Sequence, residues 1–479
     1  MARLEAIGFL NELEHRYDVN AMLHNGIRIW PLLRMKIGEH LVADAPPGSL
    51  FGGSSAPTAL AKVWQLIKGI PTLLPWHRHL ERTDLLFYSM NRHRENWGGF
   101  THDRYCDPLV KAAGELGLRS TIVEHLEFAP ITAPWTVPCS RFDSSPALML
   151  LAGLHARRRK PDPRTIPDLE ALLAHVATVD HGPSLGYIAS QLHDLDLYVR
   201  LHSRLLREAR PRCVFRVCWY AVDSMAVQHV CHTMGIRCVD LQHGVQGKGH
   251  LAYGRWAVLP STGYSSMPDV FWCWDKESAD NIASWAGGSP IKALTLGDPW
   301  MEEAPAEMMA PVWKDDGRLR VLYTAFLPDV IPRIALEALH ATHTTCQWVF
   351  RTHPGMPRLP GLMADLLKAE GLFDRAVISP ASGTPLVLAL QGCHLHITQY
   401  SSVILEAARQ GVPSVAIHHN AADLFTDTLA SGALHMALTL DDLLVHLRSP
   451  QRFTPIGNEQ PPIVERLRGI LDGLLPAAR

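Results

Sequence analysis

The sequence predicts an α/β protein in which two doubly wound domains face a cleft, with a helical extension before the first domain. Short apolar runs of strand length alternate with segments of helical periodicity, the pattern of a parallel sheet covered by helices. This alternation stops at a connector rich in Pro and Met and starts again near residue 318. The chain has 479 residues, 47% of them apolar, and can therefore form two large cores.

Composition and charge exclude several classes of function. With a formal net charge of -2, the chain is not a general polyanion binder, so no nucleic-acid partner is expected. The nine cysteines are scattered without a CxxC pair, which predicts core residues in a reducing compartment rather than a disulfide framework or a zinc site. The first residues include Glu5, Glu12 and Glu14 and lack the apolar core of a signal peptide, so we expect a cytoplasmic protein.

Residues 1–80 are expected to form a helical N-terminal extension and a linker. Apolar side chains near the start recur at helical spacing: Leu4, Ile7, Leu10 and Leu13. Residues 46–57 are rich in Pro, Gly and Ser, which is typical of a linker. Residues 60–79 combine tryptophans with basic side chains. They are a candidate contact with the inner face of a membrane, although such a stretch more often packs on its own domain.

The first doubly wound domain is predicted for residues 81–300. Its expected strands are 85–89, 121–124, 213–218, 237–241, 270–274 and 291–296. Its clearest expected helices are 224–234 and 276–285. Because strands and helices alternate, the strands should be parallel and their carboxyl ends should share one edge of the sheet.

The second doubly wound domain is predicted for residues 318–455. Its expected strands are 319–323, 347–351, 375–378, 394–398 and 414–417, with a helix at 331–342. A last helix, within residues 460–479, is expected to return and brace the first domain. Two such domains leave a cleft between the carboxyl ends of their strands, where ligands should bind.

A histidine and a glycine follow the expected strand 237–241 in the cluster Gln242-His243-Gly244. A histidine has an intrinsic pKa near neutrality, so at a strand end it can take a proton from a sugar hydroxyl. Gly244 would let the backbone approach a ligand closely. For any single histidine among 26, a chance position at a strand end is the simpler explanation, but three clusters at strand ends weaken it.

A second cluster, Arg351 and His353, follows the expected strand 347–351. Pro354 favours an extended backbone at His353 and stops a helix from starting at once. The imidazole could donate a hydrogen bond to a phosphate oxygen, with Arg351 as a further cation. A plain turn histidine explains His353 equally well when it is considered alone.

The third cluster, Ser401 and Ser402, stands between the expected strand 394–398 and a helical pattern that contains Glu406. Ser401 lies where an N-cap belongs. Two hydroxyls and the backbone N–H groups of a helix start suit a phosphate, and they would take a diphosphate without a metal. Glu406 is either an acceptor for ribose hydroxyls or a solvated helix residue.

Together the three clusters resemble motifs of bacterial GT-B glycosyltransferases that assemble surface polysaccharides. His353 with its proline and the pair Ser401-Ser402 resemble the HP and SS motifs of polysialyltransferases, capsule Kdo transferases and the CDP-glycerol polymerases of teichoic acid synthesis. The resemblance covers roughly residues 214–451. It implies two Rossmann-like domains, with these three residues binding the phosphates of a nucleotide-sugar donor. The expected donor site is completed by neighbours in the three clusters: Gly244, Arg351 and Glu406.

The element Gln242-His243-Gly244 is similar to the HG element of teichoic acid polymerases and the QHG element of capsule proteins, which implies that His243 is the catalytic base. The chain departs from polysialyltransferases in lacking their acidic D/E-D/E-G element, which disfavours a sialic acid polymerase. The acceptor should lie near Arg92 and His93, in the polar loop after the first strand.

The leading hypothesis is a metal-independent glycosyltransferase without a cofactor. It would move a sugar from a nucleotide-sugar donor, with a CMP-sugar favoured, to a growing bacterial surface glycan or a lipid-linked acceptor. No GxGxxG, Walker A or DxD pattern follows a strand, which argues against dehydrogenases, P-loop enzymes and metal-dependent transferases. Two alternatives stay open: a nucleotide-sugar epimerase of the same fold, and a non-catalytic, membrane-associated partner in polysaccharide export that binds through residues 60–79.

Overall fold

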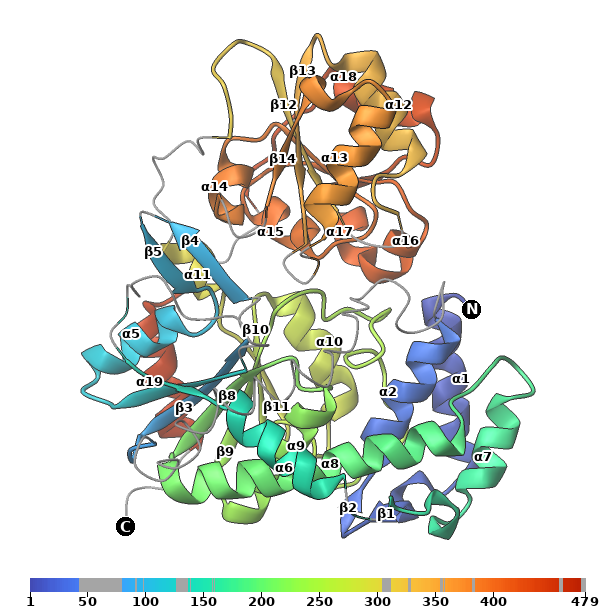
Figure 1. Ribbon diagram of the computed structural model, residues 1–479, viewed down its shortest axis with the longest axis vertical. Coiled ribbons are helices and arrows are strands. Elements are labelled where there is room, and N and C mark those ends of the chain that lie inside the picture. The colour runs from blue at the N-terminus through green and yellow to red at the C-terminus, as the bar shows by residue number, and fades with distance from the viewer. Residues whose placement is uncertain are drawn as a thin grey trace.

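The computed structural model describes residues 1–42, 80–90, 93–97, 99–125, 137, 139–156, 158, 160–303, 312–325, 329–353, 356, 358–380, 384–455 and 460–474. The expected linker 46–57, the basic stretch 60–79 and Arg92 lie outside the described residues. Two lobes are stacked along the long axis of the molecule (Figure 1). Within the described ranges, no helix is both long enough and apolar enough to cross a bilayer.

The first lobe is built on a seven-stranded sheet whose strands are all parallel, in the order β11-β10-β9-β8-β3-β6-β7. The strands are β3 (Leu85–Met90), β6 (Ser120–His125), β7 (Ser140–Asp143), β8 (Cys213–Val217), β9 (Arg237–Leu241), β10 (Val270–Cys273) and β11 (Lys292–Thr295). The six strands expected in this part of the sequence are present, and β7 is an additional edge strand. Every residue of β8 and β10 is buried, because helices cover both faces of the sheet.

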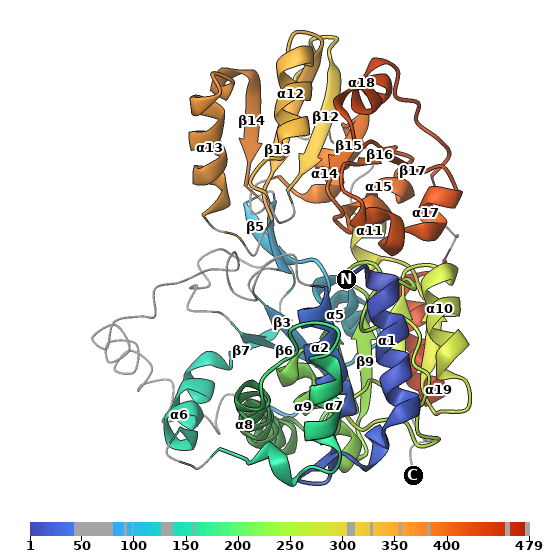
Figure 2. The same ribbon diagram turned by 90° about the vertical axis from the view of Figure 1, so that its right-hand side faces the viewer.

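The helices of the first lobe are α5 (Asp107–Glu115), α6 (Ser145–His155), α7 (Leu169–Val176), α8 (Leu185–Ala209), α9 (Val222–Met234) and α10 (Lys276–Ala286), and a 3-10 turn lies at Pro163–Thr165. The two helices expected there correspond to α9 and α10. A separate antiparallel hairpin of β4 (Arg94–Trp97) and β5 (Phe100–Asp103) projects from this lobe toward the second lobe (Figures 1 and 2). A short helix, α11 (Pro299–Glu303), begins the crossing to the second lobe.

The second lobe is built on a six-stranded parallel sheet in the order β14-β13-β12-β15-β16-β17. The strands are β12 (Leu319–Thr324), β13 (Cys346–Arg351), β14 (Ala376–Ser379), β15 (Leu395–Thr398), β16 (Ser414–Ala416) and β17 (Leu434–Met436). The helices are α12 (Arg333–Thr342), α13 (Leu359–Ala369), α14 (Leu386–Gln391), α15 (Val403–Arg409), α16 (Asn420–Leu424), α17 (Thr426–Ala430) and α18 (Leu440–Arg448), with a 3-10 turn at Phe373–Arg375. The five strands expected from the sequence are present, and β17 extends the sheet.

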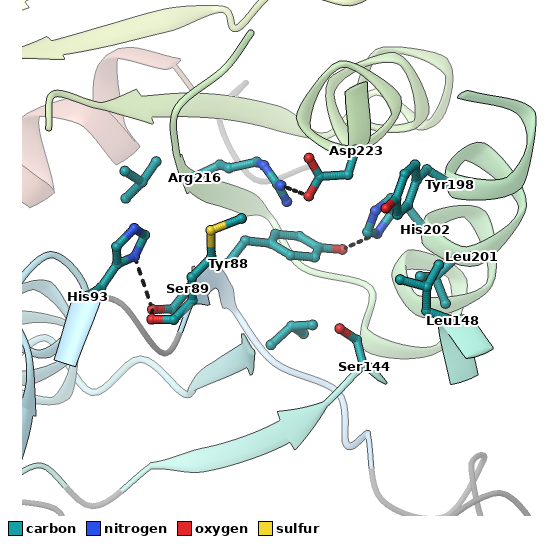
Figure 3. A pocket seen from close by; sticks show the side chains of 13 residues that line it. Tyr88, Ser89, His93, Ser144, Leu148, Tyr198, Leu201, His202, Arg216 and Asp223 are labelled. Carbon is teal, nitrogen blue, oxygen red and sulfur yellow. Dashed lines mark hydrogen bonds and ion pairs between the residues drawn. The ribbon is translucent and has the colours of Figure 1, made fainter. Parts of the chain in front are cut away.

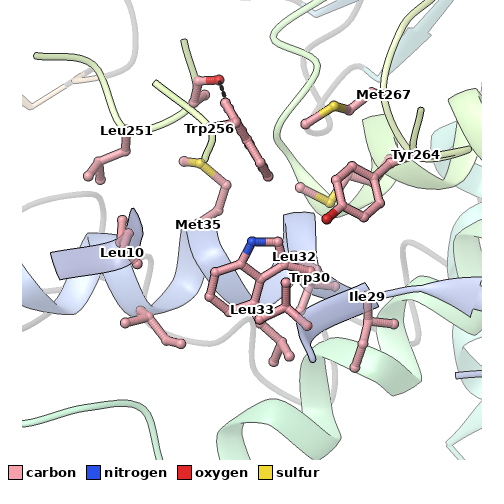
Figure 4. Packing of buried hydrophobic residues seen from close by; sticks show 14 of the residues in the cluster. Leu10, Ile29, Trp30, Leu32, Leu33, Met35, Leu251, Trp256, Tyr264 and Met267 are labelled. Carbon is pink, nitrogen blue, oxygen red and sulfur yellow. Dashed lines mark hydrogen bonds between the residues drawn. The ribbon is translucent and has the colours of Figure 1, made fainter. Parts of the chain in front are cut away.

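The N-terminal segment is helical, as expected, but it is part of the core of the first lobe. It consists of α1 (Arg3–Arg16), a 3-10 turn (Val19–Ala21), a two-stranded hairpin of β1 (Leu23–His24) and β2 (Ile27–Arg28), and α2 (Trp30–Leu41). Trp30 is fully buried in an apolar cluster that also contains Trp256 and Leu251 of the first lobe (Figure 4). The apolar face of α1 differs slightly from the expected one, because Leu4 is 44% exposed and Ala6 is buried instead.

A buried ion pair holds α1 and α2 to the rest of the lobe. Arg34 of α2 pairs with Glu14 of α1, and neither side chain is exposed to solvent. The other carboxylate oxygen of Glu14 accepts hydrogen bonds from the backbone N–H groups of Ala257, at 2.5 Å, and Val258, at 3.0 Å. The guanidinium of Arg34 lies over the ring of Trp256, 4.4 Å from its centroid. The charges are therefore satisfied by partners from three segments of the chain.

The last helix, α19 (Ile463–Leu474), returns from the second lobe and packs against α5 of the first lobe (Figure 1). Its residues Leu467, Ile470 and Leu471 are buried in the same apolar cluster as side chains of β3, β6 and β8. This is the bracing position expected from the sequence. The chain therefore crosses between the lobes twice, and the first lobe contains segments from both ends of the described sequence.

Candidate functional site

The loops that follow β9 and β15 meet between the two sheets. The first carries Gln242-His243-Gly244, and the second carries Ser401 and Ser402. A Cβ atom on Gly244 would lie 3.1 Å from both the Cβ and the Oγ atoms of Ser402. Because glycine has no side chain, the two loops can touch at this point. Two of the three clusters expected from the sequence are therefore neighbours in space.

Two further glycines bring the same loop against the second lobe. A Cβ atom on Gly249 would lie 2.2 Å from the backbone oxygen of Asp423, and one on Gly247 would lie 3.1 Å from that of Leu424. Val245 packs against the apolar cluster around α16. Sequence reasoning missed this contact, although the spacing of glycines at 244, 247 and 249 is the signal that could have indicated it. The whole loop 242–249 is therefore an inter-lobe element.

Two tyrosines flank His243, which is half-buried. The hydroxyl of Tyr220 lies 3.4 Å from its Nε2 atom, and the hydroxyl of Tyr105 donates to its backbone oxygen at 3.4 Å. His250 lies nearby, with its ring centroid 5.3 Å from that of Tyr220. Burial, together with the charges of Arg3 and His243, lowers the pKa of His250 to about 3, so its imidazole is neutral. Neither tyrosine has a local sequence signal that marks it as part of the site.

Hydrogen bonds of buried polar side chains hold the Gln242-His243-Gly244 loop in place. The Oε1 atom of Gln242 accepts from the backbone N–H of Trp274 at 2.5 Å, and its Nε2 donates to the backbone oxygen of Gly244 at 2.8 Å. In β9, the fully buried Asp240 accepts a hydrogen bond from the hydroxyl of Tyr253 at 2.9 Å. Burial raises the pKa of Asp240 to about 8. These contacts fix the backbone that carries His243.

The paired serines stand at the start of α15, but the cap is one residue later than expected. Ser402 occupies the N-cap position with helical backbone angles, and its side chain makes no capping hydrogen bond. The hydroxyl oxygen of Ser401 instead accepts from the backbone N–H of Val403 at 3.3 Å, a local turn bond that replaces the cap. Ser401 is 8% exposed. Ser402 is the serine that lies against Gly244.

Arg351 and Glu406 are both buried and both face charged partners from the first lobe. Arg351 donates to the backbone oxygen of Thr384 and lies 3.8 Å from the carboxylate of Glu95. The carboxylate of Glu406 lies 2.5 Å from a guanidinium nitrogen of Arg104. With 3% exposure, Glu406 is not a solvated helix residue, so that alternative is wrong. Its Oε1 atom is paired with a cation of the first lobe.

His353 lies in the turn after β13 and is half-buried. Its backbone oxygen accepts a hydrogen bond from the N–H of Met356 at 3.0 Å. The register of the sheet places β13 beside β12, and β12 beside β15. The histidine and the two serines therefore follow strands that are separated by one strand, at the same edge of the sheet.

A pocket lies at the carboxyl ends of β3 and β8 in the first lobe, and His93 lines it (Figure 3). The Nδ1 atom of His93 is 3.4 Å from the hydroxyl of Ser89, which donates to Asp103. On the opposite wall, Arg216 pairs with Asp223. The ring of His93 also meets that of Tyr105 edge-on, at 4.9 Å between centroids. Tyr105 therefore links this pocket to the backbone of His243.

A larger cavity of about 460 Å³ is lined by residues of both lobes, among them Trp274 and Arg409. Arg409 of α15 crosses the junction there and lies 3.2 Å from Asp275 and 3.6 Å from Asp298. Its guanidinium also lies 4.9 Å from the ring centroid of Trp274. Among the described residues, no group of three or more His, Cys, Asp or Glu side chains is arranged to hold a metal ion.

The chain matches no model of a protein family and no curated protein. Among solved structures, a candidate UDP-N-acetylglucosamine 2-epimerase from Listeria monocytogenes aligns with a TM-score of 0.52 and 12% identity, over 82% of this chain and 96% of that chain. The S. aureus MnaA-UDP co-structure aligns with a TM-score of 0.49 and 12% identity, over 82% and 96%. Acinetobacter baumannii MurG aligns with a TM-score of 0.41 and 11% identity, over 82% and 100%. At these identities the likeness concerns the fold alone: two Rossmann-like domains of the GT-B type.

Proposed function

We propose that this protein is a glycosyltransferase that moves a sugar from a nucleotide-sugar donor to a hydroxyl group of a growing bacterial surface glycan or a lipid-linked acceptor. The observation that supports it is the contact between Gly244 and Ser402. It brings the loop of the proposed base, His243, against the serines proposed to bind the donor phosphate.

In the proposed reaction, His243 takes the proton from the acceptor hydroxyl as its oxygen attacks the anomeric carbon of the donor sugar. The bond between that carbon and the phosphate oxygen breaks, and negative charge develops on the leaving phosphate. Ser401, Ser402 and His353 would donate hydrogen bonds to this phosphate, and Arg351 would add positive charge. The proposal uses no metal ion or cofactor. The resemblance to capsule enzymes favours a CMP-sugar as the donor.

The two lobes touch each other at the proposed phosphate site. Because Ser402 lies in contact with the position of a Cβ atom on Gly244, no space for a phosphate remains between these two residues. The proposal therefore requires the lobes to separate before the donor enters and to close again around it. The carboxyl edge of the first sheet, where His93 lies, is the proposed acceptor side.

Alanine at His243 tests the proposed base. We expect turnover to fall by about a hundredfold to ten-thousandfold, because general-base catalysis is lost, while nucleotide affinity changes by less than about twofold. The matched control is His15→Ala, on the exposed face of α1, which should leave both quantities unchanged. Thermal-shift measurements with CMP, CDP, UDP and GDP accompany this experiment, and stabilisation by CMP would support the favoured donor. Full turnover by the His243→Ala variant would exclude His243 as the base.

A nucleotide-sugar epimerase is the second candidate, supported by the fold likeness to the Listeria protein over 96% of that chain. An epimerase needs no acceptor, so conversion of a nucleotide sugar in the absence of any glycan would favour it over a transferase. The third candidate, a membrane-associated export partner, predicts that no nucleotide raises the melting temperature and that anionic liposomes bind the protein.

A further inference from the structure

Four charged side chains meet where the hairpin of β4 and β5 touches the second lobe. Glu95 and Arg104 come from the hairpin and the residue after it, and Arg351 and Glu406 come from β13 and α15. The carboxylate of Glu406 is 2.5 Å from the Nη2 atom of Arg104. We call these four residues the junction cluster. They form ion pairs between segments that are about 300 positions apart in the sequence.

Two guanidinium groups of the junction cluster approach one carboxylate oxygen. The Oε1 atom of Glu95 lies 3.8 Å from Nη1 of Arg104 and 3.8 Å from Nη2 of Arg351. The side chains are 14%, 7% and 5% exposed for Arg104, Arg351 and Glu95. Two arginines, one from each lobe, therefore converge on a single anionic atom in a largely dry environment. Such a pair of planar donors matches the oxygens of a phosphate.

The junction cluster also has hydrogen-bonding capacity that its own members do not use. Among the described residues, the buried Nε atom of Arg104 and the buried Oε2 atom of Glu95 have no hydrogen-bond partner. A buried ion pair contributes little net stability unless its remaining donors and acceptors are also satisfied. The unused Nε donor of Arg104 could therefore take part in binding a second, anionic ligand.

We propose that Arg104 binds a phosphate oxygen of the donor from the first lobe, opposite Arg351, and that the carboxylate of Glu406 takes the place of this phosphate when no donor is bound. This inference rests on the proposed function and adds a residue to its donor site. Binding would exchange one oxyanion for another at Arg104, without a covalent step. A phosphate between the two arginines could accept hydrogen bonds from both guanidinium groups, whereas the carboxylate of Glu406 pairs with Arg104, which favours the exchange.

The position of Arg104 would also couple donor binding to the proposed base. Its guanidinium lies 4.9 Å from the ring centroid of the next residue, Tyr105. The hydroxyl of Tyr105 donates to the backbone oxygen of His243 at 3.4 Å. A phosphate held by Arg104 would therefore lie on the element that also contacts the His243 loop. Closure of the lobes on the donor would place phosphate and base together.

The test uses two substitutions that should change the dissociation constant of the nucleotide in opposite directions. Glu406→Gln removes the competing charge, so the dissociation constant of the nucleotide should fall by at least about threefold. Arg104→Gln removes the ligand, so the dissociation constant should rise by at least about tenfold, equivalent to about 1.4 kcal/mol. Binding is measured on the full chain by titration calorimetry with CMP, CDP, UDP and GDP. If Glu406 instead recognises the ribose, Glu406→Gln should raise the dissociation constant of the nucleotide.

Asp275→Asn is the matched control, because it weakens another inter-lobe ion pair, with Arg409, outside the junction cluster. Asparagine can still accept the N-cap hydrogen bond that Asp275 receives from Ser278 of α10. Nucleotide affinity of this variant should be unchanged. Because Arg104→Gln leaves Glu406 buried without its cation, the double variant Arg104→Gln/Glu406→Gln is included, and it should bind as weakly as the single Arg104 variant.

The outcomes separate this inference from the proposed function. If the unmodified protein binds a nucleotide but Glu406→Gln binds it more weakly, or the double variant binds it as tightly as the unmodified protein, Arg104 is not a phosphate ligand. If the unmodified protein binds none of the four nucleotides at millimolar concentration, the proposed function fails and the inference fails with it.

Discussion

Buried arginines join distant segments of this chain. Arg34 connects the two N-terminal helices to the backbone of Arg255. Arg104 connects the hairpin to α15, and Arg466 connects α19 to Glu302 near the crossing. In each case the carboxylate partner is far away in the sequence or belongs to a different element. Removing one member of such a pair leaves a charge without compensation in a dry environment, which costs more than the pair itself contributes.

The buried ion pair of Glu14 and Arg34 gives a direct test of this cost. Glu14→Gln should lower the free energy of unfolding by about 3–5 kcal/mol, because the fully buried Arg34 loses its counter-ion. The measurement is urea denaturation followed by circular dichroism. The control, Glu12→Gln, changes a side chain that is 57% exposed and should cost less than about 0.5 kcal/mol. Equal stabilities for the two variants would contradict this account of the N-terminal segment.

The sequence predicted which residues lie at strand ends, but it did not predict which side chains they pair with. His243 and Ser402 follow strands that the apolar pattern identifies, and parallel strands place their carboxyl ends at one edge. The pairing of Glu406 with Arg104 depends on how the hairpin meets the second lobe, and no local pattern contains that information. For the same reason, the sequence allowed Glu406 to be a solvated residue, whereas the structure buries it.

Among the elements, the loop between β9 and β10 makes close backbone contacts with the second lobe. Its glycines at 244, 247 and 249 each face an atom of the second lobe. These three positions therefore need glycine because a side chain would collide with the second lobe, and not only because glycine suits a turn. The loop is also the carrier of His243, so the same element would set lobe distance and place the proposed base.

Gly249→Ala should hold the lobes apart. Its Cβ atom would stand 2.2 Å from the backbone oxygen of Asp423, so the loop or α16 must move, at a cost of about 1–3 kcal/mol. We expect a lower melting temperature and a larger radius of gyration in small-angle scattering. Gly114→Ala in α5 is the control, because its Cβ would meet no atom within 4 Å. An unchanged radius for both variants would show that this contact does not set the lobe distance.

Strong apolar patterns identified the central strands, but several short strands escaped detection, among them β7 and the hairpin of β4 and β5. β7 has the sequence Ser-Arg-Phe-Asp, with one fully apolar side chain, and it forms only by pairing with β6. The hairpin of β4 and β5 is mostly polar, so the sequence predicted only a polar loop there. Such edge and hairpin strands depend on neighbours more than on their own apolar periodicity.

At the scale of the whole molecule, the first lobe is assembled from discontinuous parts of the chain. Its core includes α1 and α2 from the start of the sequence, the central βα units, and α19 from beyond the second lobe. The second lobe, by contrast, is built from one continuous stretch of strands β12 to β17. The sequence predicted the returning helix, but it did not predict that the N-terminal helices enter the core.

Leu467→Ala in α19 should destabilise the first lobe. Leu467 is fully buried, and removing its side chain should cost about 2–5 kcal/mol of unfolding free energy. Urea denaturation of the full chain measures this cost. Leu4→Ala, at a position that is 44% exposed, should change the stability by less than about 0.5 kcal/mol. A cost below about 1 kcal/mol for Leu467→Ala would mean that α19 does not brace the lobe.

The return of α19 also has a consequence for synthesis of the protein. The ribosome makes 167 residues (296–462) between the end of β11 and the start of α19, which takes roughly 8–33 s at about 5–20 residues per second. During that time the face of α5 that packs against α19 has no cover, so the nascent chain presents an apolar surface that chaperones can bind. Translation of the final segment, rather than of the first lobe itself, therefore completes that lobe.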